Sequence, residues 1–221
     1  MCDRYSLRTN LDQLADLFAV TGRRSVGATN TVDIAPGQFA TVVRLASSGE
    51  RMMSQLRWGL APYWPAGGDA AMKKTTAQAE TLTQTPAFRV AFRRFRCLVP
   101  AGGFYESRTQ ENGDKQSFLV TLNQETTFAF AGLWDVWIYD DQPLETFSII
   151  TVNSGDTAQQ RMPAILPSNL YSQWLSPQSQ PEELLSSLRT YSSDAMQYQP
   201  IADVLRSRSS EIPEVPQPVA A

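Results

Sequence analysis

The 221-residue sequence contains no histidine, and this absence excludes more chemistry than any other feature of its composition. Without an imidazole, the chain can form neither a Ser-His-Asp triad nor a Cys-His dyad, and it can build no metal site that needs a histidine ligand. Any acid–base chemistry must therefore come from carboxylates, amines, thiols or tyrosine hydroxyls.

Cysteine and long apolar runs are also scarce. The two cysteines, Cys2 and Cys97, are too few for a disulfide framework or a metal cluster. No apolar run approaches the length of a membrane span, and no N-terminal segment is typical of a signal peptide. We therefore expect a cytoplasmic protein with no membrane partner, no metal and no cofactor, and nothing in the sequence calls for more than a monomer.

The length and the 42% hydrophobic content predict one globular domain, which we place at residues 1–206. From Ser207 the chain is rich in Ser, Pro and Glu, so 207–221 is expected to be a disordered tail.

Positive charge is concentrated in one segment of an acidic chain. Residues 73–96 carry six Lys and Arg against Glu80 alone, a net charge of +5, so the rest of the chain carries −8. A phosphate-binding face needs such a basic patch, and a solvated helix face has the same composition. Both interpretations stay open at this point.

Local patterns predict an α+β fold with a mainly antiparallel twisted sheet or open barrel and a few short helices. Asn10 is a helix cap before apolar residues at helical spacing, which predicts a helix over about 11–19. Thr85-Pro86, Ser168 and Pro181 open three more helices. Strands are expected at 39–45, 52–58, 95–100, 117–122, 127–133 and 145–152, with a polar hairpin loop over 107–115.

The chain is organised around an apolar strand that begins at Phe95, is interrupted by Pro100 and the Gly102-Gly103 pair, and delivers Glu106. Pro and Gly mark places where a strand bends or is approached closely. Contact with Phe104 and Tyr105 would remove solvent from the carboxyl group, which suits it to proton transfer. Taken alone, however, the pattern favours an edge-strand glutamate whose neighbours cover a core.

Cys2 becomes the N-terminal residue if Met1 is removed. It then carries an amine and a thiol on adjacent carbons, with reference pKa values of roughly 8 and 8.5. Such a group condenses with an aldehyde to an imine, which the thiol closes to a thiazolidine. Position alone gives the cysteine no functional meaning.

Together these stretches resemble the SRAP family, the SOS response-associated peptidases or abasic site processing proteins. The matching segments occur in the family's order, mainly over residues 1–166. They are Met1–Tyr5, Ile34–Gln38, Leu56–Trp64, Ala79–Thr81, the stretch to Glu106, Ala131–Trp134 and Arg161–Leu166.

The resemblance implies an SRAP-like domain that serves in the SOS response and in DNA repair, with a positively charged groove for single-stranded DNA or a single-strand junction. Cys2 matches the nucleophile that forms a thiazolidine crosslink with the ring-opened abasic site, a covalent protein–DNA linkage. Glu106 matches the glutamate that assists proton transfer. The family's peptidase label, a hydrolase class, reflects removal of the residues ahead of the cysteine, here Met1 alone.

The resemblance also implies a set of DNA contacts. Arg4 matches a basic residue near the DNA backbone, and Tyr63 and Trp64 stand where the family places aromatics against bases. Arg89 and Arg93 are expected to contact DNA through the basic segment, and Arg161 is expected in the groove wall. On DNA, the protein would associate with the nucleoid.

The chain departs from the family at several of these positions. Thr76 replaces an asparagine that positions the cysteine, Gln78 replaces a phosphate-contacting arginine, and Gln159 replaces a histidine that supports ring opening and crosslink reversal. Ser107 and Val32-Asp33 are further departures. Glutamine can form hydrogen bonds but cannot shuttle a proton, so slower crosslinking and poorer reversal are expected.

Three hypotheses follow. The first is a divergent SRAP protein that still crosslinks abasic sites through Cys2 and Glu106, weakly or irreversibly. The second is a non-catalytic paralogue that binds single-stranded DNA through Arg89, Arg93 and Arg94. The third is a remnant of the fold that binds a protein partner and no DNA. Cys97 lies in an apolar strand and is expected to be an inert buried thiol.

Overall fold

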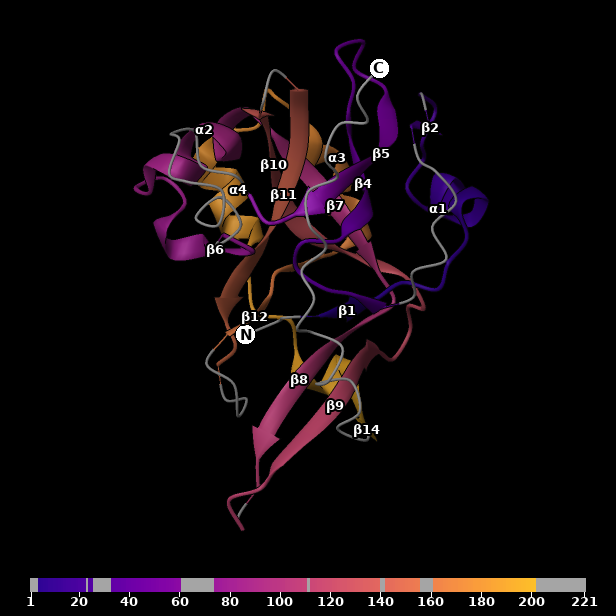
Figure 1. The fold of residues 1–221 in the computed structure, drawn as a ribbon, viewed down its shortest axis with the longest axis vertical. Helices are drawn as coiled ribbons and strands as arrows, with labels where there is room; N and C mark the ends of the chain where they lie inside the picture. Colours follow the sequence, from indigo (N-terminus) through magenta and orange to yellow (C-terminus); the bar gives the residue numbers. More distant parts are fainter. Residues whose placement is uncertain are drawn as a thin grey trace.

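The computed structural model describes residues 4–22, 24–25, 33–60, 74–110, 112–139, 142–155 and 161–201. Figure 1 shows a large sheet with helices around it in the upper part of the molecule and a smaller sheet below. The predicted α+β class with a mainly antiparallel sheet is confirmed. Within the described residues, no helix is long and apolar enough to cross a membrane.

The large sheet has the strand order β12-β11-β10-β7-β4-β5-β2, with β6 and β13 paired at its side. Its strands are β2 (Arg24–Ser25), β4 (Phe39–Leu45), β5 (Arg51–Trp58), β6 (Thr76–Gln78), β7 (Arg96–Ala101), β10 (Phe128–Tyr139), β11 (Gln142–Asn153), β12 (Arg161–Pro163) and β13 (Ile165–Leu166). A short parallel pairing between β11 and β5, at Thr146↔Arg57 and Phe147↔Trp58, joins the two ends of the run β11-β10-β7-β4-β5. These five strands therefore form a closed barrel.

Aromatic side chains fill the core near this closure. Trp58 packs against Tyr5 and Phe147, with ring centroids 5.3 and 6.2 Å apart, and Tyr5 also meets Phe130 edge-on. Opposite β7, a Cβ on Gly132 would lie 2.7 Å from the sulfur of Cys97, so the close approach of β10 and β7 requires a glycine there.

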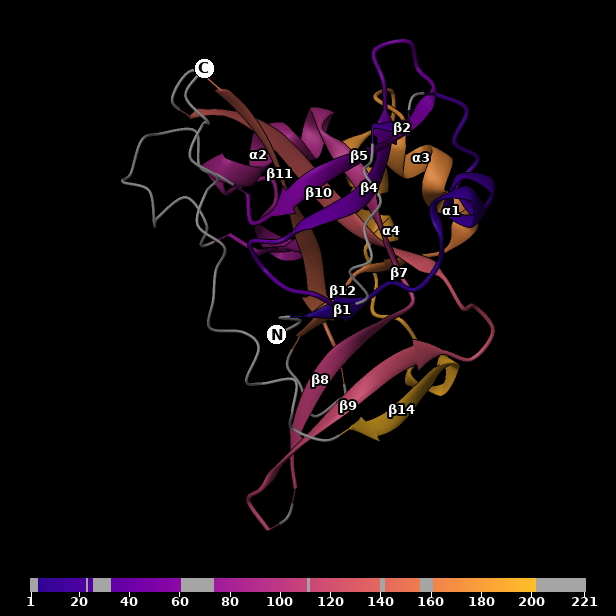
Figure 2. The same ribbon diagram turned by 45° about the vertical axis from the view of Figure 1, so that its right-hand side comes forward.

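The smaller sheet has the order β14-β9-β8-β1-β3, and Figure 2 shows it below the barrel. Its strands are β1 (Tyr5–Ser6), β3 (Asp33–Ile34), β8 (Gly103–Thr109), β9 (Lys115–Leu122) and β14 (Met196–Ile201). β7 leads into β8 through Gly102, so one continuous segment passes from the barrel into the smaller sheet. The predicted loop over 107–115 is too long, because Ser107–Thr109 pair with Lys115–Ser117 and extend both strands.

Helices begin after Asn10, at Pro86 and at Pro181 as predicted, whereas Ser168 opens a 3-10 turn and the helix expected there begins at Tyr171. They are α1 (Leu11–Leu17), α2 (Pro86–Arg94), α3 (Tyr171–Leu175) and α4 (Pro181–Ser187), with 3-10 turns η2 (Ala79–Thr81), η3 (Ser168–Leu170) and η4 (Ser193–Ala195). The Asn10 side chain accepts a 2.9 Å hydrogen bond from the N–H of Gln13, and Pro86 is the first residue of α2. α1 is shorter than expected because Phe18 ends it.

Arg96 does not belong to the basic surface of α2, although the sequence analysis counted it there. The helix ends at Arg94, and Arg96 is buried at the start of β7. Its guanidinium donates 2.6 Å hydrogen bonds to the carbonyl oxygens of Phe92, Trp174 and Ser176. Arg96 therefore fastens α2 and α3 to the barrel, and burial lowers its pKa.

Candidate functional site

Glu106 lies in the middle of β8, which pairs with β9 in the smaller sheet. Its cross-strand neighbour is Phe118, and the residue is only 6% exposed. A carboxylate this deeply buried needs a compensating partner, because desolvation of an ion costs several kcal/mol. The local alternation of β8 explains the position, since Phe104 and Glu106 point to the covered face and Ser107 points to solvent.

The partner of Glu106 is Arg108, two residues further along the same face. Arg108 Nε donates a 2.8 Å hydrogen bond to Glu106 Oε1. The guanidinium carbon also lies 3.9 Å from the ring centroid of Tyr198 on β14 and 5.5 Å from that of Phe118. Although burial opposes the charged form, the bond to Glu106 and the neighbouring Tyr198 raise the pKa of Arg108.

β1 brings the start of the described chain to this strand. Tyr5 pairs with Phe104, and the N–H of Tyr105 donates a 3.1 Å hydrogen bond to the carbonyl oxygen of Arg4. Arg4, a predicted DNA contact, therefore lies beside the residue that precedes Glu106. Its side chain is partly buried.

The hydroxyl of Tyr105 is held from β3, which lies beyond β1 in the same sheet. It donates a 2.5 Å hydrogen bond to Asp33 Oδ1. Burial and, next, this hydrogen bond raise the pKa of Tyr105. Asp33, one of the departures from the family pattern, thus has a structural contact beside the candidate site.

Trp58 connects the paired strands β1 and β8 to β6, which carries the predicted site residues Thr76 and Gln78. Its ring packs on Tyr5, and its indole Nε1 donates a 2.8 Å hydrogen bond to the carbonyl oxygen of Thr75. The next residue, Thr76, pairs with Ile149 on β11 and is partly buried. Trp58 therefore contacts both the segment that carries Arg4 and the segment that carries Thr76.

Gln78, Glu80 and Arg161 gather at the end of β11. Gln78 is exposed and pairs with Thr151. Arg161 donates hydrogen bonds to both the side chain and the carbonyl of Thr151, at 3.0 and 2.6 Å, and forms a 2.8 Å ion pair with Glu80. Burial opposes ionisation of Glu80, but the bonds from Arg161 prevail and lower its pKa. The geometry thus assigns the Arg161 side chain a structural role at the end of β11, and the predicted DNA contact stays a prediction.

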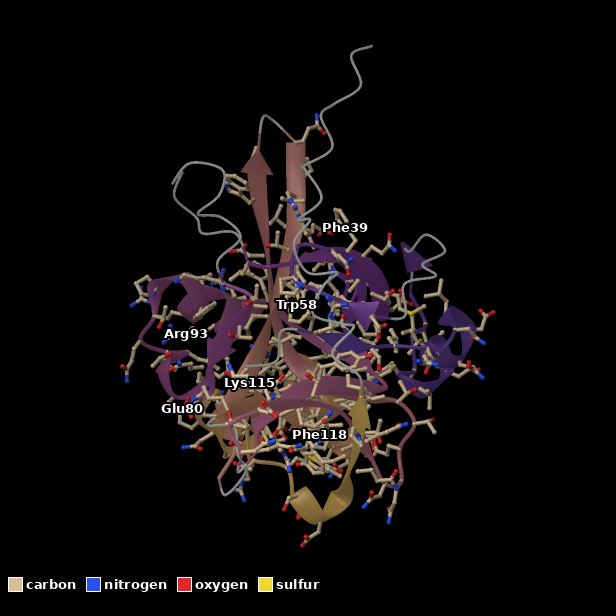
Figure 3. All side chains as sticks on the ribbon, turned by 60° about the horizontal axis from the view of Figure 1, so that its bottom comes forward. Phe39, Trp58, Glu80, Arg93, Lys115 and Phe118 are labelled. Carbon is tan, nitrogen blue, oxygen red and sulfur yellow. The ribbon has the colours of Figure 1, made fainter. Side chains whose placement is uncertain are left out.

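The exposed arginines of α2 form a separate surface. Arg89, Arg93 and Arg94, with Val90, line a depression of about 420 Å³. Among the described residues, none of the three arginines has an ion-pair partner. Figure 3 places Arg93 at the left of the molecule, well away from Phe118, the cross-strand neighbour of Glu106. The structure therefore does not bring these arginines next to the glutamate.

Several predicted site residues lie outside the described part of the chain. They are Cys2 with Met1, Tyr63, Trp64, Gln159 and the tail 207–221. Cys97, by contrast, is fully buried, and burial raises the pKa of its thiol, as expected for an inert residue.

The sequence analysis missed Arg108 and Tyr198. Arg108 had a usable signal, because residues two apart in a strand share a face and a buried glutamate favours a cationic neighbour. The expected loop over 107–115 hid this relationship. Tyr198 gave no local signal, because its contact depends on the pairing of β14 with β9.

Comparison with proteins of known sequence extends the resemblance over nearly the whole chain. Residues 1–207 match the family model described as SOS response associated peptidase (SRAP). The abasic site processing protein YoqW of Bacillus subtilis is 31% identical over 97% of this chain and 98% of its own. The abasic site processing protein HMCES of Xenopus tropicalis is 28% identical over 76% of this chain and 58% of its own.

Solved structures show the same fold. A Bacteroides thetaiotaomicron protein superposes with a TM-score of 0.79 at 26% identity, covering 94% of this chain and 95% of that protein. A Bordetella bronchiseptica protein gives 0.77 at 24% identity, over 91% of this chain and all of its own. With the family match, these likenesses show that the chain belongs to the SRAP (SOS response associated peptidase) family.

Proposed function

We propose that this protein processes abasic sites in single-stranded DNA by forming a covalent crosslink through Cys2. The observation that carries the proposal is the buried, arginine-held carboxylate of Glu106, next in sequence to the residue that binds the backbone of Arg4. Its relatives named as abasic site processing proteins support the same substrate.

Chain connectivity supports Cys2 as the reacting group. Cys2 precedes Arg4 by two residues, so its Cα is at most about 7 Å from that of Arg4. Arg4 in turn accepts a hydrogen bond from Tyr105, the residue before Glu106. So short a tether limits how far a terminal amine can lie from Arg4 and therefore from β8.

The reaction follows from these two groups. After Met1 is removed, the neutral amine of Cys2 attacks the aldehyde carbon of the ring-opened sugar, and the carbonyl oxygen leaves as water to give an imine. The thiol sulfur then adds to the same carbon, its proton moves to the nitrogen, and a thiazolidine results. Glu106 accepts and returns the protons that these steps exchange.

The departures from the family pattern limit the rate rather than the chemistry. Neither Thr76 nor Gln159 can take over proton transfer from a histidine, so Glu106 is the proposed proton carrier for every step. We therefore propose a slower crosslink that reverses poorly.

The test is a denaturing gel after incubation with an abasic-site oligonucleotide. Wild-type protein with confirmed Met1 removal should give a heat-stable adduct, Cys2→Ser none, and Glu106→Gln a much slower one. Cys97→Ser is the matched control and should react like wild type. Absence of an adduct from the mature wild-type protein would overturn the proposal.

A second candidate function is DNA binding without chemistry, through Arg89, Arg93 and Arg94. The observation that favours it is their exposed cluster around one depression, apart from Glu106. Salt-dependent binding of undamaged single-stranded DNA, unchanged by Cys2→Ser and unaccompanied by an adduct, would establish this function in place of the first.

A further inference from the structure

We propose that Arg108 is the positioning residue of the proton-transfer site, and that Tyr198 on β14 holds Arg108 against Glu106. This inference rests on the proposed function of Glu106 and adds two residues to it, neither of which the family resemblance assigns. The three side chains come from β8 and from a strand about ninety positions later in the sequence.

The contacts form a continuous chain on one face of the smaller sheet. Strand register places Glu106 opposite Phe118 and Tyr198 opposite Val120, so all four side chains share the face that carries Arg108. The Arg108 guanidinium donates a 2.8 Å hydrogen bond to Glu106, and its carbon lies 3.9 Å from the ring centroid of Tyr198. A cation over a tyrosine ring is stabilised by about 0.5–2 kcal/mol.

The bond fixes one carboxylate oxygen and leaves the other for the reaction. Arg108 Nε binds Oε1, and no described residue donates a hydrogen bond to Oε2. An arginine stays charged throughout the accessible pH range, so it orients the carboxylate without exchanging a proton itself. Glu106 is then held as a base with one oxygen aimed by its partner.

Arg108 is the charged side chain that contacts Glu106 on this face. In the described parts of β8, β9 and β14, the titratable side chains that contact one another on this face are Glu106, Arg108 and Tyr198. Tyr105, with Asp33, Arg4 and Arg8 nearby, alternates to the opposite face of β8. A change at Arg108 therefore alters the charge next to Glu106 and leaves the other cluster intact.

A purely structural role for Arg108 makes a different prediction from a positioning role. If the arginine only neutralised a buried charge, its loss would lower stability, and the protein that stays folded would react at the wild-type rate. If it positions the carboxylate, its loss should slow the reaction in folded protein as well, because the reacting oxygen is no longer held in place.

The experiment compares Arg108→Met, Arg108→Lys and Tyr198→Leu with wild type. Single-turnover adduct formation is followed from pH 5 to pH 9, and binding of undamaged single-stranded DNA is measured by fluorescence anisotropy. Lys115→Met is the matched control, because Lys115 is an exposed cation on the same hairpin, opposite Thr109 and at the end of β9 (Figure 3).

We expect Arg108→Met to slow adduct formation by about tenfold to a hundredfold across this pH range at temperatures where the variant is fully folded. Arg108→Lys should recover part of the rate, and Tyr198→Leu should lose part of it. DNA affinity should change little in all three, and Lys115→Met should match wild type in both readouts. A wild-type rate in folded Arg108→Met, or no recovery in Arg108→Lys, would overturn the inference.

An activity-independent readout separates this inference from the proposed function. Carbon-13 NMR of labelled glutamate carboxyls should show a changed chemical shift for the Glu106 carboxyl in Arg108→Met and an unchanged one in Lys115→Met. A shift without any wild-type adduct would reject the crosslinking function and keep the coupling between the two residues. An adduct with no shift would reject the role of Arg108 alone.

Discussion

The indole Nε1 of Trp58 donates a 2.8 Å hydrogen bond to the carbonyl oxygen of Thr75, and this bond adds to the pairing with β11 in joining the barrel to the strand that carries Thr76. The same indole packs against Tyr5, whose strand leads back to the N-terminal segment. Trp58 therefore sets the relative position of two segments that the proposed chemistry needs together.

We expect Trp58→Phe to cost about 2–4 kcal/mol in the free energy of unfolding, because it leaves a void in the core and removes one of the two hydrogen bonds to the Thr75 carbonyl, the other coming from the N–H of Ile149. Urea denaturation measures this loss. The variant should also form the adduct more slowly at temperatures where it is fully folded. Phe147→Leu is the control, because it removes core volume next to Trp58 but keeps the hydrogen bond to Thr75. Equal rates for the two variants would argue against a positioning role for Trp58.

Arg96 is expected to be the most sensitive arginine for stability. Arg96→Met removes the guanidinium's hydrogen bonds to the carbonyls of Phe92, Trp174 and Ser176 and should cost about 3 kcal/mol or more. Arg96→Lys should recover only part of this, because one ammonium cannot reach three carbonyls in the fixed geometry of a guanidinium. Thermal unfolding checks both, with Arg93→Met on the exposed face of α2 expected within about 0.5 kcal/mol of wild type.

Tyr105 predicts a loss of stability in alkali. Burial and the hydrogen bond to Asp33 raise its pKa, so the folded state holds the phenol proton more tightly than the unfolded chain does. Its contribution is therefore complete below about pH 10, the ordinary tyrosine value, and is lost as the pH rises further. Tyr105→Phe should flatten the decline of unfolding free energy above that pH. Asp33→Asn should bring the pKa of Tyr105 partly back toward the ordinary value, as ring-labelled NMR can show.

The Glu80–Arg161 ion pair predicts the opposite pH dependence. The lowered pKa of Glu80 means that its contribution is present above the ordinary glutamate value and is lost as the pH falls through the folded-state value. Because Glu80 is half exposed, Glu80→Gln should cost at most about 1 kcal/mol at neutral pH. A loss that does not shrink at high salt would contradict a screened surface pair.

The α2 arginines predict a salt effect that is independent of Cys2. Each arginine that neutralises a phosphate of single-stranded DNA adds about 0.7 to the slope of log affinity against log salt. Replacing Arg89, Arg93 and Arg94 by glutamine should therefore reduce the slope by about 2 if all three make such contacts. Fluorescence anisotropy across a salt series measures it, and an unchanged slope would remove α2 from the DNA-binding surface.

Local sequence signals predicted the elements that depend on local physics. Strand-forming runs bounded by turn residues located β4 and β5 to within one residue, and the helix-start signals at Asn10 and Pro86 located α1 and α2. The parallel pairing of β11 with β5 joins residues nearly ninety positions apart, and no pattern within either strand encodes it.

The errors have physical reasons as well. Arg96 follows Arg89 and Arg93 at helical spacing, yet α2 ends at Arg94 and the side chain turns inward to three carbonyls. Polar residues at 107–109 suggested a loop, although a hairpin strand with one face in water is polar too. Reading those residues as a loop is what concealed the Arg108–Glu106 pair.

The most direct test of the central claim is the intact mass of the purified protein before and after incubation with an abasic-site oligonucleotide. We predict a protein that lacks Met1 and then gains the mass of the oligonucleotide less one water, with no gain for Cys2→Ser. Mature wild-type protein that keeps its unmodified mass would contradict the claim that this chain crosslinks abasic sites.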